Sequence, residues 1–509
     1  MKILSAPQIR AADAATIERE PIASLDLMER AASACANWLM QRVEARQPGF
    51  EHPIFHIICG VGNNGGDGLV VARLLHAKGY PVAVYVCVFS EKFSPDFKAN
   101  AKRLKAAGIP THEIRHSKDL PELPSEGILV DALFGSGLSR SVTGIAATTI
   151  QAINRAALTK VAIDLPSGLH AEDNREFDPK NTVRANFTLC FELPKLAFLF
   201  PDNADFVGNW QVLPIGLDPK FIAEASTSNH YLVAPLLQQL LRSRARFSHK
   251  GSFGHVALLA GSKGKIGAAI LAARAAMRSG AGLVTVHVPD IGNNILQTAV
   301  PEAMVVCNEA PHYLENYPAD LGGKHLAIGP GIGTETQTAG VLKRLIQSAE
   351  GPVVFDADAL NLLAQQPTWL SFLPPHSILT PHPGEFKRLV GRTDGEYGRH
   401  QALIQLARKH RVFVVLKGAH TAIADPDGTV YFNSTGNPGM ATGGMGDALT
   451  GILIGLLAQG YPPKAACLLG VFLHGLAGDL AAQEKGMEAL LASDVIDHLG
   501  AAFQHLRNT

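Results

Sequence analysis

Short apolar runs alternate with helical segments along the first half of the chain. Five of these runs predict buried strands, at 54–59, 82–89, 127–135, 161–168 and 185–193. Helical patterns lie between them, as at 68–78 and 97–108. Strands that alternate with helices form a parallel sheet covered on both faces. The pattern therefore predicts an α/β domain with a doubly wound sheet.

The alternation weakens at 218–230 and then resumes. A helix is predicted at 267–279, and segments containing strands follow at 283–289, 325–333, 352–361, 377–386 and 412–432. The turn ADPDG within the last segment predicts a hairpin. The two halves share no readable repeat, and 509 residues are too many for one core. We therefore predict two different α/β domains, 1–222 and 223–509, joined by a linker near 218–230.

Composition and charge exclude several classes of function. Lys plus Arg and Asp plus Glu each number 45, so no net charge attracts the chain to nucleic acid or to an anionic membrane. The six cysteines are scattered without a pairing pattern, as reduced thiols are in a cytosolic protein. The N-terminus lacks the apolar core of a signal peptide, and the apolar runs near 448–458 and 465–473 are shorter than a membrane span. We expect a soluble, cytoplasmic protein.

Polar side chains follow or end three of the predicted strands in the first half. They are Asn63, Asn64 and Asp67 after the first strand, Asp131 in the third, and Asp164 and Ser167 in the fourth. Ligands bind beyond the carboxyl ends of the strands in open α/β sheets, so these groups are expected to form one polar site. The alternative is that each acidic residue caps the helix or turn that follows it. For any one of these residues the capping role is the better explanation. For polar groups at the ends of three strands together, a shared site is the better one.

The glycine-rich stretch GVGNNGGDG, residues 60–68, lies between a predicted strand and a predicted helix. Such a unit is the nucleotide-binding form of an α/β fold. The stretch does not match G-x-G-x-x-G, because asparagines replace the spacer positions and an aspartate follows. Its amides and carboxylate suit a cation or a polar ligand as well as a phosphate.

A second glycine-rich stretch, NPGMATGGMGDALTG at 437–451, leads into a long apolar run that predicts a buried helix. Glycine amides at a helix N-terminus bind phosphate, because the N–H groups converge there and the helix dipole favours negative charge. Asp447 would lie one step from such a phosphate, where the base of a phosphoryl transfer belongs. A glycine-rich turn that Asp447 caps explains the same residues equally well.

Taken together, the motifs of the two halves resemble the two modules of one enzyme family. VGNNGGDG, VDALFGSGL and IDLPSG look like the epimerase module of the bifunctional NAD(P)H-hydrate repair enzymes, which implies a Rossmann-like sheet. KIGAAILAARAAMRSGAGLVTV, GPGIG, DADALN, TPHPGE, LKGAHT and NPGMATGGMGD look like the ADP-dependent dehydratase module, which implies a ribokinase-like fold. The resemblance covers nearly the whole chain, with the motifs in the expected order.

The resemblance implies a substrate, NADH or NADPH with water added across a ring double bond. The first module would interconvert the R and S epimers of this hydrate. The second would dehydrate the S form at the expense of ADP, giving NAD(P)H, AMP and phosphate. Hydroxide is a poor leaving group, and phosphorylation of the hydroxyl would make it a good one. Asp447 matches the ribokinase-like base that removes the hydroxyl proton.

For the epimerase module, the resemblance assigns Asn64, Asp131 and Ser167 to a potassium ion, whose preference for oxygen ligands they suit. Asp164 would contact the hydrated ring and is the candidate for proton transfer, either by ring opening and reclosure or by loss and return of water. The residues expected to hold the dinucleotide are Asn63, Asn64, Gly65, Gly66 and Asp67, together with Gly135, Ser136, Gly137, Leu138, Ser139, Arg140 and Ser141.

For the dehydratase module, the resemblance assigns Ala268, Gly333, His382 and Asp447 to the hydrate pocket. It assigns Lys417, Gly418, Ala419, His420, Thr421 and Gly446 to ADP, which Mg²⁺ would accompany. His382 is otherwise a structural histidine in a turn, and Lys417 is otherwise a solvated lysine. Asp356 and Asp358 either orient Mg²⁺ or cap the helix of DADALN.

Two other functions fit parts of the sequence. The C-terminal domain could be a ribokinase-like kinase of a small molecule, such as a vitamin precursor alcohol, because GGMGD alone does not separate the two reactions. The N-terminal domain could bind a ligand or a protein without catalysing a reaction. We expect hydrated NADH, hydrated NADPH and ADP as ligands, and a homo-oligomeric assembly.

Overall fold

The computed structural model describes all residues, 1–509, which form two compact units. The N-terminal unit contains Lys2–Thr227 with Gly395–Tyr397, and the C-terminal unit contains Met1, Ser228–Asp394 and Gly398–Thr509. The main boundary, between residues 227 and 228, falls inside the interval predicted as a linker. That interval is not unstructured, because it holds the helix α7 (Pro219–Glu224) and the strand β8 (Asn229–Tyr231).

The N-terminal unit is built on seven parallel strands. They are β1 (Phe55–Cys59), β2 (Val82–Cys87), β3 (Thr111–Ile114), β4 (Ile128–Ala132), β5 (Thr159–Ile163), β6 (Phe187–Phe191) and β7 (Asn209–Leu213). Its other helices are α1 (Ala6–Arg19), α2 (Ser24–Glu44), α3 (Asn63–Ala77), α4 (Pro95–Ala106), α5 (Gly144–Arg155) and α6 (Ala204–Val207). The strand order is β3-β2-β1-β4-β5-β6-β7, so the direction of winding reverses between β1 and β4.

Helices cover both faces of this sheet, as the sequence predicts. Ile57 of β1 belongs to an apolar cluster with residues of α2, α3 and α4. Its neighbour Ile58 faces the other way and joins the cluster that contains the buried side of α5. Successive side chains of a strand point to opposite faces, so these two clusters are the two layers of the doubly wound arrangement. Ligand sites in such sheets lie where the winding reverses, beyond the carboxyl ends of β1 and β4.

The helix predicted at 68–78 begins earlier, at Asn63, and this prediction was therefore wrong at its start. The glycines that suggest a loop lie within the first turns of α3. A Cβ at Gly65 would overlap the carbonyl oxygen of Gly60, and one at Gly68 would lie 2.8 Å from the sulfur of Cys59. These glycines therefore allow the helix to begin directly against the end of β1.

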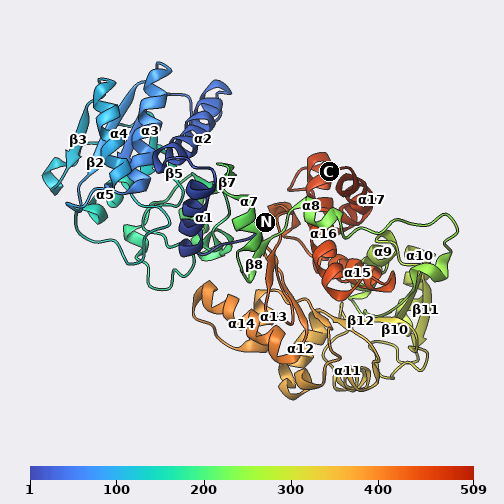
Figure 1. Cartoon of the computed structure of the whole chain (residues 1–509). Coiled ribbons are helices and arrows are strands. Elements are labelled where there is room, and N and C mark those ends of the chain that lie inside the picture. Colours follow the sequence, from blue (N-terminus) through green and yellow to red (C-terminus); the bar gives the residue numbers. More distant parts are fainter. The chain divides into compact units, whose positions relative to one another are not determined.

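The C-terminal unit contains a ten-stranded sheet in the order β11-β10-β9-β12-β13-β14-β15-β16-β17-β8 (Figure 1). The remaining strands are β9 (His255–Leu259), β10 (Leu283–Pro289), β11 (Met304–Asn308), β12 (His325–Ile328), β13 (Val353–Phe355), β14 (Ile378–Leu379), β15 (Phe413–Leu416), β16 (Ala422–Ala424) and β17 (Val430–Phe432). The strands from β11 to β15 pair in parallel. The predicted hairpin is confirmed, because β16 and β17 pair antiparallel.

Ten helices belong to the sequence of this second half. They are α8 (Ala234–Gln238), α9 (Ile266–Arg278), α10 (Asn293–Ala299), α11 (Thr336–Ser348), α12 (Ala357–Gln365), α13 (Pro383–Val390), α14 (Gly395–His410), α15 (Met445–Ala458), α16 (Pro463–Lys485) and α17 (Ala492–Asn508). By length and composition α16 could span a membrane, but 67% of its most apolar window is buried within the protein. It is therefore a core helix, longer than the apolar run at 465–473 suggests.

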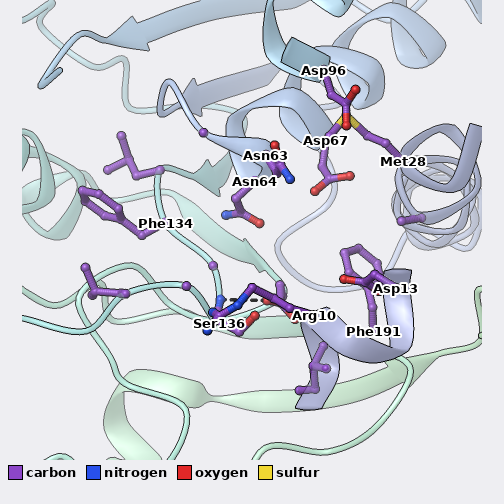
Figure 2. Close-up of a pocket in the computed structure, with 18 of the residues that line it drawn as sticks. Arg10, Asp13, Met28, Asn63, Asn64, Asp67, Asp96, Phe134, Ser136 and Phe191 are labelled. Carbon is purple, nitrogen blue, oxygen red and sulfur yellow. Dashed lines mark hydrogen bonds between the residues drawn. The ribbon is translucent and has the colours of Figure 1, made fainter. Parts of the chain in front are cut away.

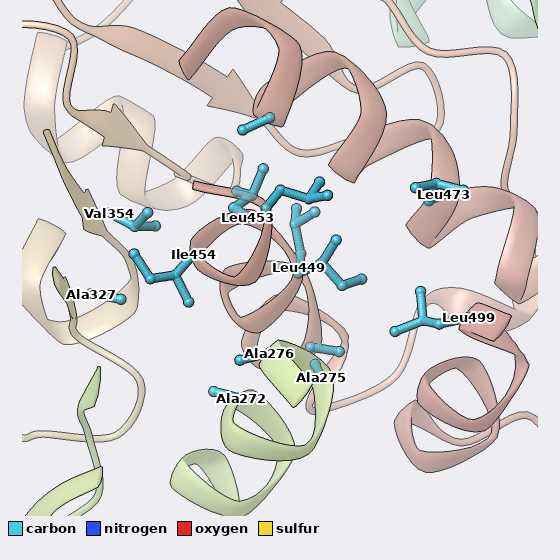
Figure 3. Packing of buried hydrophobic residues seen from close by; sticks show 14 of the residues in the cluster. Ala272, Ala275, Ala276, Ala327, Val354, Leu449, Leu453, Ile454, Leu473 and Leu499 are labelled. Carbon is cyan, nitrogen blue, oxygen red and sulfur yellow. The ribbon is translucent and has the colours of Figure 1, made fainter. Parts of the chain in front are cut away.

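The core of the C-terminal unit centres on the contact between α15 and α9 (Figure 3). Leu449, Leu453 and Ile454 of α15 belong to the same buried cluster as the alanines of α9. A Cβ at Gly451 would overlap the carbonyl oxygen of Ala272, and one at Gly455 would overlap the Ser279 hydroxyl. The two glycines therefore bring the helix axes close together, and α15 is held in one position along α9.

Candidate active sites

The N-terminal unit contains a cavity of about 760 Å³ beyond the carboxyl ends of β1, β4 and β5. The sequence-predicted residues that line it are Asn63, Asn64, Asp67, Gly135, Ser136, Gly137, Leu138, Ser139, Arg140 and Asp164. Gly65 and Gly66 are buried in α3 behind the lining, and the Ser141 hydroxyl donates to the carbonyl of Glu176. Polar groups from the ends of β1 and β5 and from the loop after β4 thus surround one space (Figure 2). The predicted residues Asp131 and Ser167 are not part of its lining.

Asp164 is held in the cavity wall by strained backbone and by two partners. Its φ is +64°, a left-handed conformation that is uncommon outside glycine and occurs at functional sites. Its Oδ2 accepts the N–H of Ser136 at 2.9 Å, and its Oδ1 lies 3.1 Å from the Lys195 ammonium. These contacts hold both oxygens of the carboxylate in place.

Lys195 is a site residue that the sequence did not reveal. Its side chain is 0% exposed, and its ammonium also donates to the carbonyls of Phe191 and Leu193 at 2.7 and 3.3 Å. A buried lysine needs partners for its charge, and Asp164 supplies the negative one. In the sequence, this lysine is distinguished only by its position just after an apolar strand. That position alone does not separate it from a surface lysine.

Asp131 and Ser167 contact each other next to this cavity. The carboxylate of Asp131, which is 0% exposed, accepts the Ser167 N–H at 2.8 Å and the Ser167 hydroxyl at 2.7 Å. Burial raises the pKa of Asp131 to about 6, and the hydrogen bonds from Ser167 and from the Leu133 N–H oppose that rise.

Asn64 contributes an amide to the same region. A Cβ at Gly135 would lie 3.2 Å from its Oδ1 and 3.0 Å from Oδ2 of Asp164, so these two oxygens flank the glycine. The Nδ2 atom of Asn64 is buried without a hydrogen-bond partner. The neutral and anionic oxygens of Asn64, Asp131 and Ser167 are the donor chemistry that a hard cation prefers.

In the C-terminal unit, the glycines of the second motif lie at the start of α15, as predicted. Gly444 occupies the N-cap position with φ +88°, a conformation that favours glycine. Because glycine has no side chain, no capping group accepts hydrogen bonds from the first N–H groups of the helix. Asp447 lies in the first turn and is not the N-cap residue. Burial, and then the neighbouring Asp356, raise the pKa of Asp447 to about 7, while Lys417 opposes the rise.

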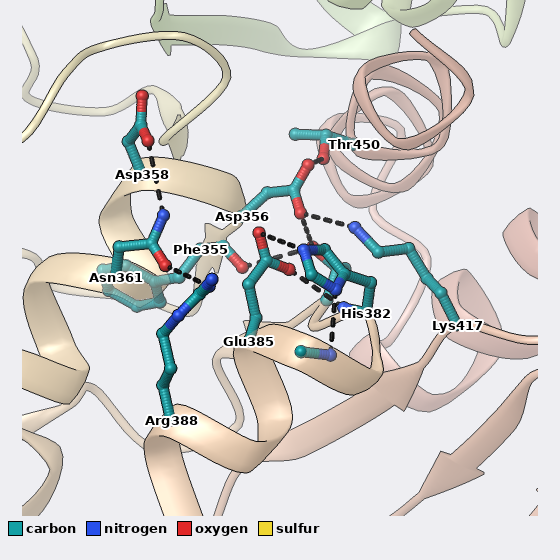
Figure 4. A network of polar contacts seen from close by, with 11 residues as sticks. Phe355, Asp356, Asp358, Asn361, His382, Glu385, Arg388, Lys417 and Thr450 are labelled. Atoms are coloured by element: carbon teal, nitrogen blue, oxygen red, sulfur yellow. Dashed lines mark hydrogen bonds and ion pairs between the residues drawn. The ribbon is translucent and has the colours of Figure 1, made fainter. Parts of the chain in front are cut away.

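Asp356 anchors a polar network behind this helix start (Figure 4). Its carboxylate is 1% exposed and accepts hydrogen bonds from Thr380 at 2.7 Å, Thr450 at 2.7 Å and Lys417 at 2.9 Å. Its side chain makes no capping bond to α12, so the simple capping role is wrong for this residue. With every contact directed at the protein, Asp356 acts as the counter-ion of Lys417.

Lys417 is not a solvated lysine, because its side chain is 21% exposed. Burial disfavours its charge, but Asp356 outweighs that effect and raises the pKa of Lys417. A Cβ at Gly446 would lie 3.2 Å from the Lys417 ammonium. A fixed positive charge therefore lies against the N-terminus of α15, and both features attract anions.

The remaining sequence-predicted residues lie around this network. The Gly333 N–H donates to Asp358 at 2.9 Å, and Ala268 lies beside the neighbouring Gly331. His382 caps α13, since its Nδ1 accepts the Gly384 N–H at 3.0 Å while half of the ring stays exposed. His382 thus stabilises the start of α13, and its ring can still be reached by a ligand.

The loop at 417–421 closes on itself. The Thr421 hydroxyl donates to the carbonyl of Gly418 at 3.0 Å, and the His420 ring contacts the carbonyl of Asn433 at 3.0 Å. Ala419 is exposed at the tip. Figure 4 shows Lys417, Asp358 and His382 near Asp356. Asp358 accepts a hydrogen bond from Asn361, and His382 contacts Glu385.

Comparison with known proteins agrees with this division. Residues 24–197 match the family model described as YjeF-related protein N-terminus, and residues 256–500 match the one described as NAD(P)H-hydrate dehydratase. The bifunctional NAD(P)H-hydrate repair enzyme of Moorella thermoacetica is 36% identical over 99% of this chain and 97% of its own length. That of Coxiella burnetii is 37% identical over 97% of each chain.

The chain belongs to the bifunctional NAD(P)H-hydrate repair enzymes. It therefore carries an NAD(P)H-hydrate epimerase in its N-terminal unit and an NAD(P)H-hydrate dehydratase in its C-terminal unit. A ribokinase-like superfamily protein of Enterococcus faecalis supports the fold of the second unit, with 30% identity and a TM-score of 0.50 over 56% of this chain and 99% of its own. The alternatives of a vitamin kinase and of a non-catalytic N-terminal domain are set aside by these matches.

Proposed function

We propose that Asp447 is the base of the dehydratase and that the amides beginning α15 bind the transferred phosphoryl group. The observation that supports this is the position of Asp447 in the first turn of α15, beside the charge of Lys417. A carboxylate with a pKa near 7 is suited to accept the hydroxyl proton at neutral pH. The exposed helix N–H groups and Lys417 would stabilise the charge of the phosphoryl group during transfer.

We propose ADP as the phosphoryl donor, with Lys417, Gly418, Ala419, His420, Thr421 and Gly446 around it. Ala268, Gly333 and His382 would line the hydrate pocket. Both oxygens of Asp356 are engaged by protein donors, and Asp358 accepts the Gly333 N–H and contacts Lys265 at 3.2 Å. Mg²⁺ would therefore be held mainly by the ADP phosphates, as is usual for this ion. Loss of phosphate from the phosphorylated hydrate then gives NAD(P)H, AMP and phosphate.

We propose that the cavity of the N-terminal unit is the epimerase site. Asp164 would contact the hydrated ring and transfer a proton, because its carboxylate is fixed in the cavity wall by Ser136 and Lys195. Potassium would be held by oxygens of Asn64, Asp131 and Ser167 and would supply positive charge next to the substrate. The segments 63–67 and 135–141 would hold the dinucleotide.

The purified chain tests these assignments directly. With S-hydrated NADH, ADP and Mg²⁺, we expect recovery of the absorbance of the reduced nicotinamide ring and equal amounts of AMP and phosphate. With the R epimer and no ADP, we expect conversion to the S epimer only. Recovery without ADP consumption would contradict the role of ADP, and release of a stable phosphorylated hydrate would contradict the coupling of transfer to elimination.

We also propose that the protein is cytoplasmic and forms a homo-oligomer. A cytoplasmic location is supported by six cysteines that are all free thiols, five of them buried. Fractionation of cells that make the protein tests it. A homo-oligomeric state is tested by sedimentation of the purified chain.

A further inference from the structure

The helix α1 contributes to the epimerase cavity although it lies outside the residues matched by the N-terminal family model. It begins with a capping box between Ser5 and Gln8. Ala12 and Thr16 are buried against the rest of the unit. The neighbouring face of the helix carries Ile9, Arg10, Asp13 and Ile17 into the cavity lining. Figure 2 shows Asp13 facing the same space as Asn64 and Asp67.

Asp13 is a carboxyl group without a partner of its own. It makes no hydrogen bond or ion pair with another residue, whereas Asp164 is held by Lys195 at 3.1 Å and by the Ser136 N–H at 2.9 Å. Burial, and then the negative charge of Asp164, raise the pKa of Asp13 to about 6, while the positive charge of Lys195 opposes the rise. Asp13 and Asp164 thus line one cavity, and only Asp164 has a cationic partner.

Other ionisable groups line the same cavity. Burial, followed by the charges of Asp164, Asp13 and Asp96, raises the pKa of Asp67 well above its usual range. Arg10 is exposed at the rim of the cavity. Lys195 is thus the one buried cation at this point, and its ammonium lies against Asp164.

We propose that Asp13 is the proton donor of the epimerase and that Asp164 is its proton acceptor. The inference rests on the proposed assignment of epimerisation to this cavity. Lys195 has the role of a positioning residue, because its ammonium holds the Asp164 carboxylate in place at 3.1 Å.

The chemistry of the hydrate requires one donor and one acceptor, since its hydroxyl-bearing carbon is bonded to the ring nitrogen. In ring opening, Asp164 takes the hydroxyl proton as the carbonyl forms, the carbon–nitrogen bond breaks with its electron pair going to nitrogen, and Asp13 protonates that nitrogen. Reclosure on the other face reverses both transfers.

Loss and return of water makes the same demand. Asp13 protonates the departing hydroxyl, and the nitrogen lone pair forms a carbon–nitrogen double bond as water leaves. Water then adds to the opposite face and gives its extra proton to Asp164. A proton passing from Asp164 back to Asp13 through solvent restores the starting state. Two groups are needed on this route because water leaves from one face of the ring and returns to the other.

The test is Asp13→Asn, assayed with the R epimer in the absence of ADP so that only epimerisation is seen. We expect kcat to fall about 100-fold with little change in KM, because a positioned donor is lost while the side chain keeps its size. Glu18→Gln removes an exposed carboxylate from the same helix and should leave the rate unchanged. Dehydration of the S epimer with ADP reports that each variant is folded.

A pH profile separates a proton donor from a structural residue. In the wild-type protein, kcat/KM for epimerisation should fall as pH rises above about 6, because Asp13 loses its proton. Asp13→Asn should lack this limb, and Asp13→Glu should restore part of the rate. Wild-type rates for Asp13→Asn together with a slow Asp164→Asn would overturn the role of Asp13 alone. Wild-type rates for both variants would show that epimerisation occurs elsewhere.

Discussion

The ammonium of Lys417 lies 2.9 Å from Oδ1 of Asp356, and the other oxygen of this carboxylate accepts the Thr450 hydroxyl at 2.7 Å. Thr450 is itself part of α15, the helix whose first turn carries Asp447. One buried carboxylate therefore fixes both the cation and the helix that form the proposed phosphoryl site. Position and charge at this site depend on the same residue.

Lys417→Met should weaken ADP binding and destabilise the C-terminal unit by about 3 kcal/mol, because Asp356 would be left as a buried charge without a cation. Calorimetric titration with ADP and chemical denaturation measure the two effects. Lys464→Met is a matched control, since Lys464 lies 2.9 Å from the buried Asp425 in the same unit. It should leave ADP affinity unchanged. Equal ADP affinity in Lys417→Met and the wild-type protein would remove Lys417 from the ADP site.

Asp447→Asn should reduce dehydration of the S epimer about 1000-fold and leave epimerisation of the R epimer intact, because only the dehydratase loses its base. In the wild-type protein, kcat/KM for dehydration should fall as pH drops below about 7, since the base must be ionised. Stopped assays of both epimers across this range check the prediction. Retention of dehydratase activity in Asp447→Asn would contradict it.

The same substitution should stabilise the C-terminal unit at alkaline pH. The pKa of Asp447 is raised from 3.8 to about 7 in the folded chain, so the folded state holds the proton more tightly than the unfolded state does. Stability therefore declines as pH rises from 3.8 towards 7, and the deficit then stays constant. Asn lacks this titration. Denaturation without ligands should show the variant more stable than wild type above about pH 7, with the gap closing in acid.

Replacement of potassium by tetramethylammonium should slow epimerisation, because the proposed oxygen ligands would lose the cation that balances Asp131. Asp131→Asn should be slow in both salts, since the anionic ligand is gone and only one of its two acceptor oxygens remains. Dehydration of the S epimer in the same buffers is the internal control. An epimerisation rate that is equal in both salts would argue against a potassium site.

The central strands of both sheets could be predicted from the sequence, because parallel strands that are buried on two faces form continuous apolar runs. The edge strands β3, β7, β8 and β11 were not predicted, because each is partly exposed and lacks such a run. The strand predicted at 283–289 coincides with β10. The start of α3 could not be found in this way. Its glycines are required because the helix contacts β1 and β4 closely, and these contacts exist only in the folded chain. In a sequence without that information, a run of glycines suggests a loop.

The polar groups of the two sites could be predicted only where they belong to motifs, which lie at strand ends for Asn64 and Asp164 and at the start of a helix for Asp447. Lys195 and Asp13 could not, because each resembles a surface residue until the tertiary fold buries it. Their importance follows from which charges the folded chain places next to them. Asp356 could be predicted in part. Its DADALN motif is visible in the sequence, but the three side chains that donate hydrogen bonds to it are not.

The glycine-to-alanine contact between α15 and α9 has a consequence for the timing of catalysis. Because Gly451 and Gly455 seat one helix directly on the other, α15 has no room to slide, rotate or tilt. Asp447 is carried on the first turn of that helix and is therefore the stationary part of the dehydratase. The hydrate and the nucleotide must therefore move to the base. Conformational change during turnover then accompanies substrate entry and product release, and not movement of the base.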